Sequence, residues 1–345
     1  MFDFKQLALP VIQAPMAGGV CTPELVAAVA NNGGVGSFGF AYSTPEKIDA
    51  DLSAASQLTK GPLNANFFVF SPVALPSPEI QCNAVDALNR LPVAGPYTTD
   101  IPTGNFFPKL EDQIEPVWQH RPSILTFHFA IPPASILEKA HALGIAVGIT
   151  ATSVDEARAI ERAGADFIVA QGVEAGGHRG TFEPNADADE KLNAIELTKR
   201  LSQQCRIPVV TAGAIMDGAD MRRALDAGAT ATQLGTAFLC CDESGASAAH
   251  KDFLLNQTQR QSALTKAFSG RLARGVENDF MRLMANQSTL PFPIQNTLTG
   301  PLRQWATKTN NGEYQSLWAG SAFAKTRKMP AKELMQTLKQ ELMSA

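Results

Sequence analysis

The sequence predicts an α/β protein: a (β/α)8 TIM barrel with an insertion after its third strand and a helical C-terminal extension. Eight short apolar runs alternate with amphipathic segments, and three of these segments end in an Ala-Gly or Leu-Gly turn directly before an apolar run. Eight strands separated by helices are typical of this barrel, and a doubly wound open sheet is the main alternative. The chain has 345 residues, of which 45% are hydrophobic, so it can bury one large core.

The first three strands are expected near residues 9–13, 35–38 and 63–69. Thr22 and Thr44 each precede a proline between these strands. A threonine hydroxyl caps the first turn of a helix and proline fits that turn, so a helix should begin after each threonine.

The segment from residue 71 to 122 is rich in proline. The fixed φ angle of proline disfavours long regular elements, so we expect an irregular insertion, of the kind that forms a lid. A short helix is expected only around residues 110–119.

The remaining strands are expected near residues 124–129, 146–150, 167–171, 207–211 and 231–234. Gly144, Gly164 and Gly228 should end the preceding helices in the left-handed conformation. We therefore divide the chain into a barrel core over residues 1–245, insertion included, and a helical extension over residues 246–345.

Composition narrows the class of protein. The net charge is −4 and basic clusters are absent from the sequence, which argues against a nucleic-acid partner. The apolar runs are too short to span a bilayer, and the first residues do not resemble a secretory signal. The five cysteines show no paired spacing, and no metal-binding motif is present. These features predict a cytoplasmic protein without a metal, a membrane or a nucleic-acid partner.

Two glycine turns follow the last two strands, at Gly213 and at Gln233-Leu234-Gly235-Thr236. Either turn alone could be a simple tight connection, but loops at these two places form the recurrent phosphate site of such barrels. The run from Gly34 to Gly39 matches the dinucleotide pattern GxGxxG in letters only. It closes a helix and continues into a strand instead of opening a helix, so it does not predict a dinucleotide site.

The stretch from Gln171 to Gly180 holds four glycines and His178 directly after the sixth strand. Catalytic groups of this fold lie at that end of the strands, and histidine exchanges protons near neutral pH. We therefore predict that His178 is catalytic. His128 ends the fourth strand and either faces the same mouth or lies in the core. His120, His141 and His250 are expected on the surface.

Small residues and amides complete this mouth. Ala14, Pro15 and Met16 follow the first strand, and Gln13, Asn66 and Gln171 can supply amide groups. A flat cofactor with many ring heteroatoms and a single phosphate requires such a set. Flavin mononucleotide (FMN) meets that description.

The residues just described resemble the nitronate monooxygenase family, class I members most closely, over nearly the whole chain. The resemblance rests on the segments 13–19, 64–70, 127–129, 170–180, 212–213, 233–236 and 317–320. It implies an FMN enzyme of detoxification that oxidises alkyl nitronates, propionate 3-nitronate above all, with O2 through a flavin semiquinone. The products would be a carbonyl compound with nitrite or nitrate, and no reduced nicotinamide would be needed.

The resemblance also implies roles for individual residues. His178 would act as a base toward a nitroalkane or hold the nitronate against the flavin, and His128 with the insertion would shape the substrate pocket. Ala14, Pro15 and Met16 would run along the isoalloxazine ring. The other residues expected to contact FMN are Asn66, Gln171, Gly176, Gly177, Gly213, Gln233, Leu234, Gly235 and Thr236.

Other functions share these motifs. An FMN-dependent enoyl-acyl carrier protein reductase that uses NAD(P)H and an NADH:quinone reductase of the same superfamily have the same glycine-histidine loop. A flavin-binding module without catalysis is a further alternative. For each enzyme we expect small-molecule substrates and a monomer or homodimer.

Overall fold

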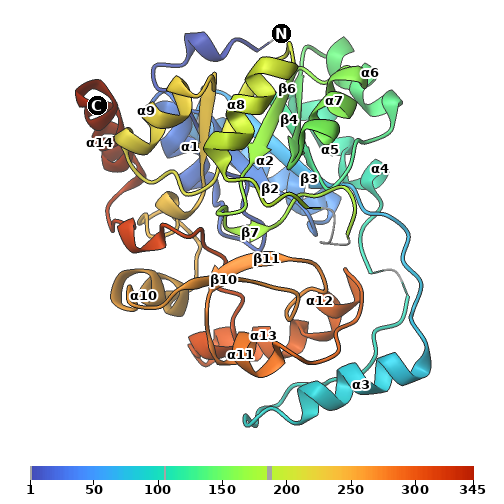
Figure 1. Ribbon diagram of the computed structural model, residues 1–345. Coiled ribbons are helices and arrows are strands. Elements are labelled where there is room, and N and C mark those ends of the chain that lie inside the picture. Colours follow the sequence, from blue (N-terminus) through green and yellow to red (C-terminus); the bar gives the residue numbers. More distant parts are fainter. Residues whose placement is uncertain (1, 105, 185–188) are drawn as a thin grey trace.

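Eight parallel strands form a closed barrel in the computed structural model, which describes residues 2–104, 106–184 and 189–345 (Figure 1). The order of strands around the sheet is β1, β9, β8, β6, β5, β4, β3 and β2. A parallel bridge between Ile12 and Val35 joins the first strand to the last one in that order. The predicted barrel is therefore confirmed and the open sheet is excluded. The strands are β1 (Val11–Gln13), β2 (Gly36–Gly39), β3 (Leu63–Phe68), β4 (Ile124–His128), β5 (Ala146–Ala151), β6 (Phe167–Gln171), β8 (Val209–Ala212) and β9 (Ala231–Leu234).

The helices that cover the barrel begin and end where their capping residues predict. Thr22 and Thr44 accept hydrogen bonds from the first turns of their helices, at 3.1 and 3.3 Å. Gly144, Gly164 and Gly228 adopt the expected positive φ angles at the return into the sheet. The helices are α1 (Pro23–Asn31), α2 (Pro45–Leu58), α4 (Leu110–Gln113), α5 (Glu115–His120), α6 (Ala134–Ala142), α7 (Val154–Arg162), α8 (Ala194–Gln204) and α9 (Gly218–Asp226).

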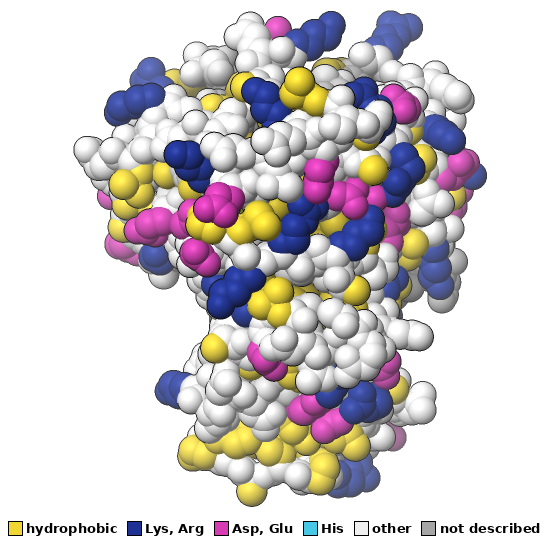
Figure 2. All heavy atoms as spheres, turned by 90° about the vertical axis from the view of Figure 1, so that its left-hand side faces the viewer, with side chains coloured by type: hydrophobic (Ala, Val, Ile, Leu, Met, Phe, Trp, Pro, Cys, Tyr) yellow, Lys and Arg dark blue, Asp and Glu magenta, His cyan; other side chains and the backbone are white. Residues whose placement is uncertain are grey.

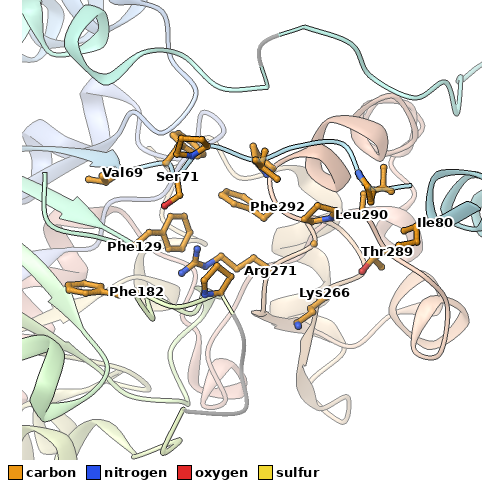
Figure 3. A pocket seen from close by; sticks show the side chains of 18 residues that line it. Val69, Ser71, Ile80, Phe129, Phe182, Lys266, Arg271, Thr289, Leu290 and Phe292 are labelled. Atoms are coloured by element: carbon orange, nitrogen blue, oxygen red, sulfur yellow. The ribbon is translucent and has the colours of Figure 1, made fainter. Parts of the chain in front are cut away.

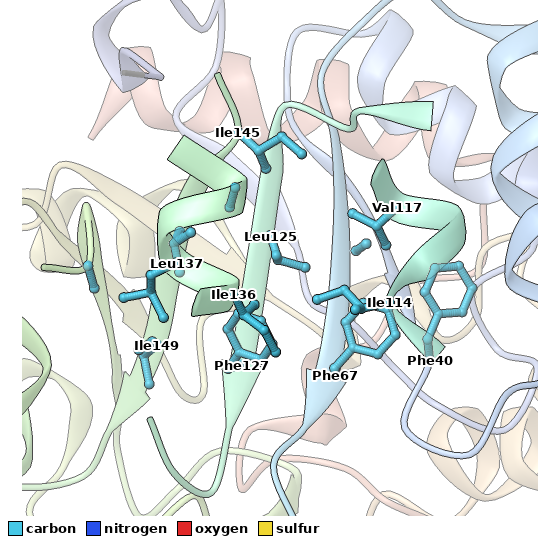
Figure 4. Packing of buried hydrophobic residues seen from close by; sticks show 14 of the residues in the cluster. Phe40, Phe67, Ile114, Val117, Leu125, Phe127, Ile136, Leu137, Ile145 and Ile149 are labelled. Atoms are coloured by element: carbon cyan, nitrogen blue, oxygen red, sulfur yellow. The ribbon is translucent and has the colours of Figure 1, made fainter. Parts of the chain in front are cut away.

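The outer core lies between the strands and these helices. Large apolar side chains on the outward faces of β3, β4 and β5 meet α5 and α6, and Figure 4 shows Phe127 between the strands and Ile136. Such residues are fully buried, and burial of one of them stabilises the fold by about 1.5–3 kcal/mol.

The barrel interior is apolar at the end where the strands begin. Phe4, in a short 3-10 helix (Phe4–Gln6), places its ring 5.1 Å from the ring of Phe167. Ile12, Val35 and Val210 complete this plug. The N-terminal segment therefore closes this end of the barrel, which is the upper one in Figure 1.

The insertion differs from the prediction. Residues Pro78–Asn89 form a regular twelve-residue helix, α3, although prolines were expected to prevent one. Proline occupies only its first turn, where it has no hydrogen bond to lose. Ala84 and Leu88 of α3 pack against Phe268 and Leu302 of the C-terminal part of the chain, away from the barrel (Figure 1). The helix expected near residues 110–119 is present as α4 and α5.

The C-terminal part contains the expected helices and also a small sheet that the sequence analysis missed. β10 (Ser262–Thr265) pairs with β11 (Ala273–Val276), and β11 pairs with β7 (Gly177–His178), all antiparallel. The strands are short and lie among turns, so their pattern is weak. The helices are α10 (Ala248–Asn256), α11 (Asp279–Met284), α12 (Ile294–Leu298), α13 (Gly300–Lys308) and α14 (Ala331–Ser344).

Helix α14 returns to the barrel and packs between α1 and α9. Figure 2 shows this side of the molecule, with lysine, arginine, aspartate and glutamate side chains interspersed and a narrowing below the barrel. Within the described ranges, no helix combines the length and the apolar character that a membrane crossing requires.

Candidate active site

His178 lies in β7, where the loop after β6 reaches the C-terminal part of the chain. Its backbone pairs with Ala273 of β11, so two distant segments fix its position. Four aromatic rings surround the imidazole: the centroids of Phe68, Phe129, Phe292 and Trp318 lie 5.9, 5.8, 5.4 and 5.7 Å from its own. The histidine predicted to be catalytic therefore stands in a largely apolar enclosure.

Ser269 determines which imidazole nitrogen of His178 carries the proton. Nε2 of His178 lies 2.9 Å from the Ser269 hydroxyl, and that hydroxyl donates to the carbonyl of Arg271 at 3.1 Å. Because the hydroxyl proton is used in this way, we assign Nε2–H as the donor to Ser269. Nδ1 of His178 then keeps its lone pair and can accept a proton or a hydrogen bond.

Burial of the imidazole, and then the neighbouring His128, Arg271 and Arg303, lower the pKa of His178 to about 3. An apolar environment disfavours the charged ring, and positive neighbours add to that effect. His178 is therefore neutral at physiological pH.

His128 lies beside this site, but both of its ring nitrogens are bonded within the protein. Nε2 donates to the backbone carbonyl of His178 at 3.2 Å, and Nδ1 accepts from the Thr150 hydroxyl at 3.0 Å. Burial, with Arg271 as the next cause, lowers the pKa of His128 to about 3. The ring therefore supports the backbone that carries His178.

Gln171 supports the same backbone from the end of β6. Its Nε2 donates to the carbonyl of His178 at 2.9 Å, and its Oε1 accepts from the amide of Gly180 at 2.8 Å. The amide predicted to face a cofactor thus holds the glycine loop in shape. Arg179, next in the chain, points away and forms a buried ion pair with Asp189 at 2.8 Å.

Arg271 and Arg303 give the site its positive charge. The Arg271 guanidinium lies 3.9 Å above the Phe129 ring, and its buried Nε has no hydrogen-bond partner among the described residues. Burial lowers the pKa of Arg271 to about 10, which leaves it charged at neutral pH. Burial also lowers the pKa of Arg303. The site therefore favours an anionic ligand.

The loops after β1, β6 and β9 meet beside this enclosure. A Cβ on Gly235 would lie 3.2 Å from Cβ of Ala14, and a Cβ on Gly176 would lie 2.6 Å from the backbone at Gly320. The amide of Gly320 donates to the Thr236 hydroxyl at 3.0 Å. Glycine at positions 176 and 235 therefore allows these loops to approach each other closely.

The other predicted cofactor residues differ in what they can offer. Asn66 donates to Thr126, while its Oδ1 accepts no hydrogen bond from the described residues. Gly213, after β8, has a φ angle of 140°. Leu234 packs its side chain into the core beside α1, so only its backbone faces the loops. Pro15 and Met16 lie in the loop after β1, and Gly177 is next to His178. Gln233 lies in β9, where it pairs with Ile12 of β1.

Two expectations require correction. Gln13 is fully buried, and its amide bonds Ser37, Ala14 and Cys21, so it is not available to a ligand. His250 was expected on the surface but is only 7% exposed, because the inner face of α10 packs on the chain near Trp318. The sequence pattern could not reveal the burial of His250, because α10 is only weakly amphipathic.

Sequence reasoning missed Ser269, Arg271 and Phe292 as parts of the site. They come from loops of the C-terminal part that have no glycine motif and no regular spacing. Trp318 lies in the segment 317–320 that carried the resemblance, although no role was assigned to it. In the part of the chain that the structure describes, no group of three or more His, Cys, Asp or Glu side chains could hold a metal ion.

Comparisons with known proteins show the family of the chain. A family model described as nitronate monooxygenase matches residues 2–341. The nitronate monooxygenase of Pseudomonas aeruginosa is 39% identical over 341 residues, which cover 96% of each chain. A probable nitronate monooxygenase of Bacillus subtilis is 34% identical, with 97% of this chain and 96% of the relative covered.

Among solved structures, nitroalkane oxidase from Streptomyces ansochromogenes has a TM-score of 0.92 and 34% identity, with 99% of this chain and 97% of that chain covered. The match of the whole chain in sequence and in fold leads to one conclusion. The chain belongs to the nitronate monooxygenase family of oxidoreductases.

Proposed function

We propose that this protein binds FMN and uses O2 to oxidise alkyl nitronates, propionate 3-nitronate among them, to a carbonyl compound with nitrite or nitrate. The observation that carries the proposal is the neutral His178, enclosed by aromatic rings beside the buried Arg271 and the half-buried Arg303. A nitronate is an anion that has already lost its proton. Positive charge and a weak base suit that substrate.

The residues of the mouth fit FMN. Oε2 of Glu174 is buried without a hydrogen-bond partner, next to Gly172 and Gly213. A ribityl hydroxyl group would supply the missing donor, and Oδ1 of Asn66 can accept from a ring N–H. Backbone amides at Gly213, Gly235 and Thr236 would hold the phosphate.

The remaining contacts follow from the same arrangement. Ala14, Pro15 and Met16 would border the isoalloxazine ring, and Gln171, Gly176, Gly177, Gln233 and Leu234 would support it or contact it. When bound, FMN would supply the redox chemistry, with the nitronate as the electron donor and O2 as the electron acceptor.

The protein's own groups bind and orient the substrate. Arg271 attracts the anion and can donate its unpartnered Nε–H to a nitronate oxygen, while Ser269 holds Nε2 of His178 and the neutral imidazole borders the substrate. The pKa of about 3 makes His178 a poor base for a neutral nitroalkane. We therefore expect a strong preference for the nitronate over the nitroalkane. His128 is proposed to position His178, because both of its ring nitrogens are occupied.

The test is an anaerobic absorbance spectrum of the FMN-loaded protein with propionate 3-nitronate, NADPH or NADH added separately. Bleaching of the flavin bands by the nitronate alone is the expected result. Bleaching by a nicotinamide alone would support the second candidate, a reductase, which shares the Gly176-Gly177-His178 loop. If the protein does not bind added FMN, the proposed cofactor is wrong.

Replacement of His178 separates an enzyme from a passive flavin module. His178→Asn should lower kcat/KM by about 10²-fold or more and leave FMN bound. His120→Asn, at a surface histidine paired with Asp49, is the matched control and should leave activity unchanged. Unchanged turnover in His178→Asn would show that His178 has no catalytic role. The division at residue 245, the cytoplasmic location and the monomeric or homodimeric state stay predictions.

A further inference from the structure

A cavity of about 400 Å³ lies between the barrel and the C-terminal part of the chain (Figure 3). Phe129 and Phe292 belong to its wall, and the same two rings pack against the imidazole of His178. The cavity therefore begins directly beside the enclosure of the catalytic histidine. Its size is within the range of ~300–1,000 Å³ that is usual for small-molecule sites.

The wall of the cavity is apolar along most of its length. Figure 3 shows Val69, Phe182 and Phe129 on the barrel side, and Leu290 and Ile80 on the opposite side. Ile80 belongs to α3, so the insertion contributes to the wall. A hydrocarbon segment would be the favoured occupant of this space.

Two cations, Lys266 and Arg271, interrupt the apolar wall. Neither forms an ion pair with a carboxylate in the described parts of the chain, and no aspartate or glutamate is among the described residues of the wall. The buried Nε of Arg271 lacks an acceptor. A buried donor without a partner costs about 1–3 kcal/mol, which a bound anionic oxygen would recover.

We propose that this cavity is a subsite for the non-reacting arm of the substrate, and that the arm is a hydrocarbon chain ending in an anionic group. The nitronate group lies between His178 and Arg271, the chain passes Phe129 and Phe292, and the anionic end meets Lys266. The preferred substrates are then ω-carboxylated nitronates longer than three carbons. This inference rests on the proposed function.

The experiment measures kcat/KM by O2 consumption for nitronates of linear ω-nitrocarboxylic acids of three to eight carbons. Ethyl nitronate and the nitronates of the corresponding 1-nitroalkanes are measured alongside. Burial of each added methylene should raise kcat/KM about fourfold until the cavity is full. The acid series should exceed the neutral series by about tenfold at equal length.

Two substitutions locate the effect in the cavity. Ile80→Trp narrows the wall and should lower kcat/KM for the six-carbon acid at least tenfold while ethyl nitronate stays within twofold. Lys266→Met should reduce the preference for the acid over the neutral chain. Leu283→Trp, on α11 outside the cavity wall, and Lys332→Met, exposed on α14, are the matched controls.

A kcat/KM that is independent of chain length, or equal losses in Ile80→Trp and Leu283→Trp, would overturn the subsite. Ethyl nitronate, which lacks a long arm, distinguishes a failure of the subsite from a failure of the proposed function. If the wild-type protein oxidises it without any gain for longer acids, the subsite is wrong and the proposed function stands. If neither ethyl nitronate nor propionate 3-nitronate is oxidised, the proposed function fails.

Discussion

The two ends of the barrel interior differ in chemistry although the same strands build both. At the end where the strands begin, Phe4, Ile12 and Phe167 fill the space with apolar groups only. At the mouth, where the strands end, the inward side chains are polar, with Asn66 and Thr126 bonded to each other and His128 bonded to Thr150. The apolar end can contribute only packing, while the mouth keeps polar groups whose burial is costly and whose value is functional.

The largest effect is expected from breaking the apolar end. Phe167→Ala removes a ring that packs on Phe4 and covers Gly148, so the free energy of unfolding should fall by about 3–5 kcal/mol. Urea denaturation measures this loss. kcat/KM of the folded protein should not change, whereas Phe68→Ala, next to His178, should lower kcat/KM. Equal losses of activity in the two variants would contradict the division of roles.

Acid should act on three histidines whose pKa is lowered by burial: His128 and His178 at the mouth, and His250 in α10. Burial keeps the pKa of His128 and His178 at about 3 and that of His250 at about 4, below the usual value of 6.5. Between pH 6.5 and 4 these histidines bind protons in the unfolded chain but not in the folded chain. The free energy of unfolding is therefore largest above pH 6.5 and falls as the pH decreases toward 4. The slope is about 1.4 kcal/mol per pH unit for each histidine. Urea titrations from pH 7.5 to 4.5 test this, and His250→Gln should reduce the slope by one proton.

Two glycines offer a matched pair across the ends. Gly177 in the mouth and Gly144 at the end where the strands begin both have a φ angle of 77°, and a Cβ on either would meet no atom within 4 Å. Alanine at each should therefore lower the free energy of unfolding by the same ~1–2 kcal/mol of backbone strain. Only Gly177→Ala should also alter FMN affinity, measured by quenching of flavin fluorescence. An equal effect of Gly144→Ala on FMN affinity would show that the effect is not specific to the mouth.

The smallest effect is expected at Ser269. Ser269→Ala removes the acceptor for Nε2 of His178, a bond with a net value of about 0.5–1.5 kcal/mol. kcat should fall about three- to tenfold, and the acid limb of the kcat/KM profile should move. Ser344→Ala, an exposed serine in α14, is the control. A fall in KM alone would show that Ser269 does not act through His178.

The barrel could be predicted because each of its signals is local. The β6 and β9 boundaries agree with the expected ranges at both ends, and the turns at Gly144 and Gly228 follow from single residues. The site could be predicted only where a motif lies in one segment, as around His178. Ser269 and Phe292 reach that histidine from segments about a hundred residues later in the chain, and no local pattern encodes such a meeting. Helix α3 was missed because proline was counted without regard to its position in the helix.

Helix α14 has a consequence for the order in which the molecule can be assembled. Leu334 and Leu338 of this helix share one core cluster with Leu25 and Val29 of α1. During synthesis on the ribosome, α1 emerges early but cannot cover its outward apolar face until α14 has been made. The nascent barrel therefore exposes an apolar strip for most of its translation, a surface through which chains can associate until α14 covers it.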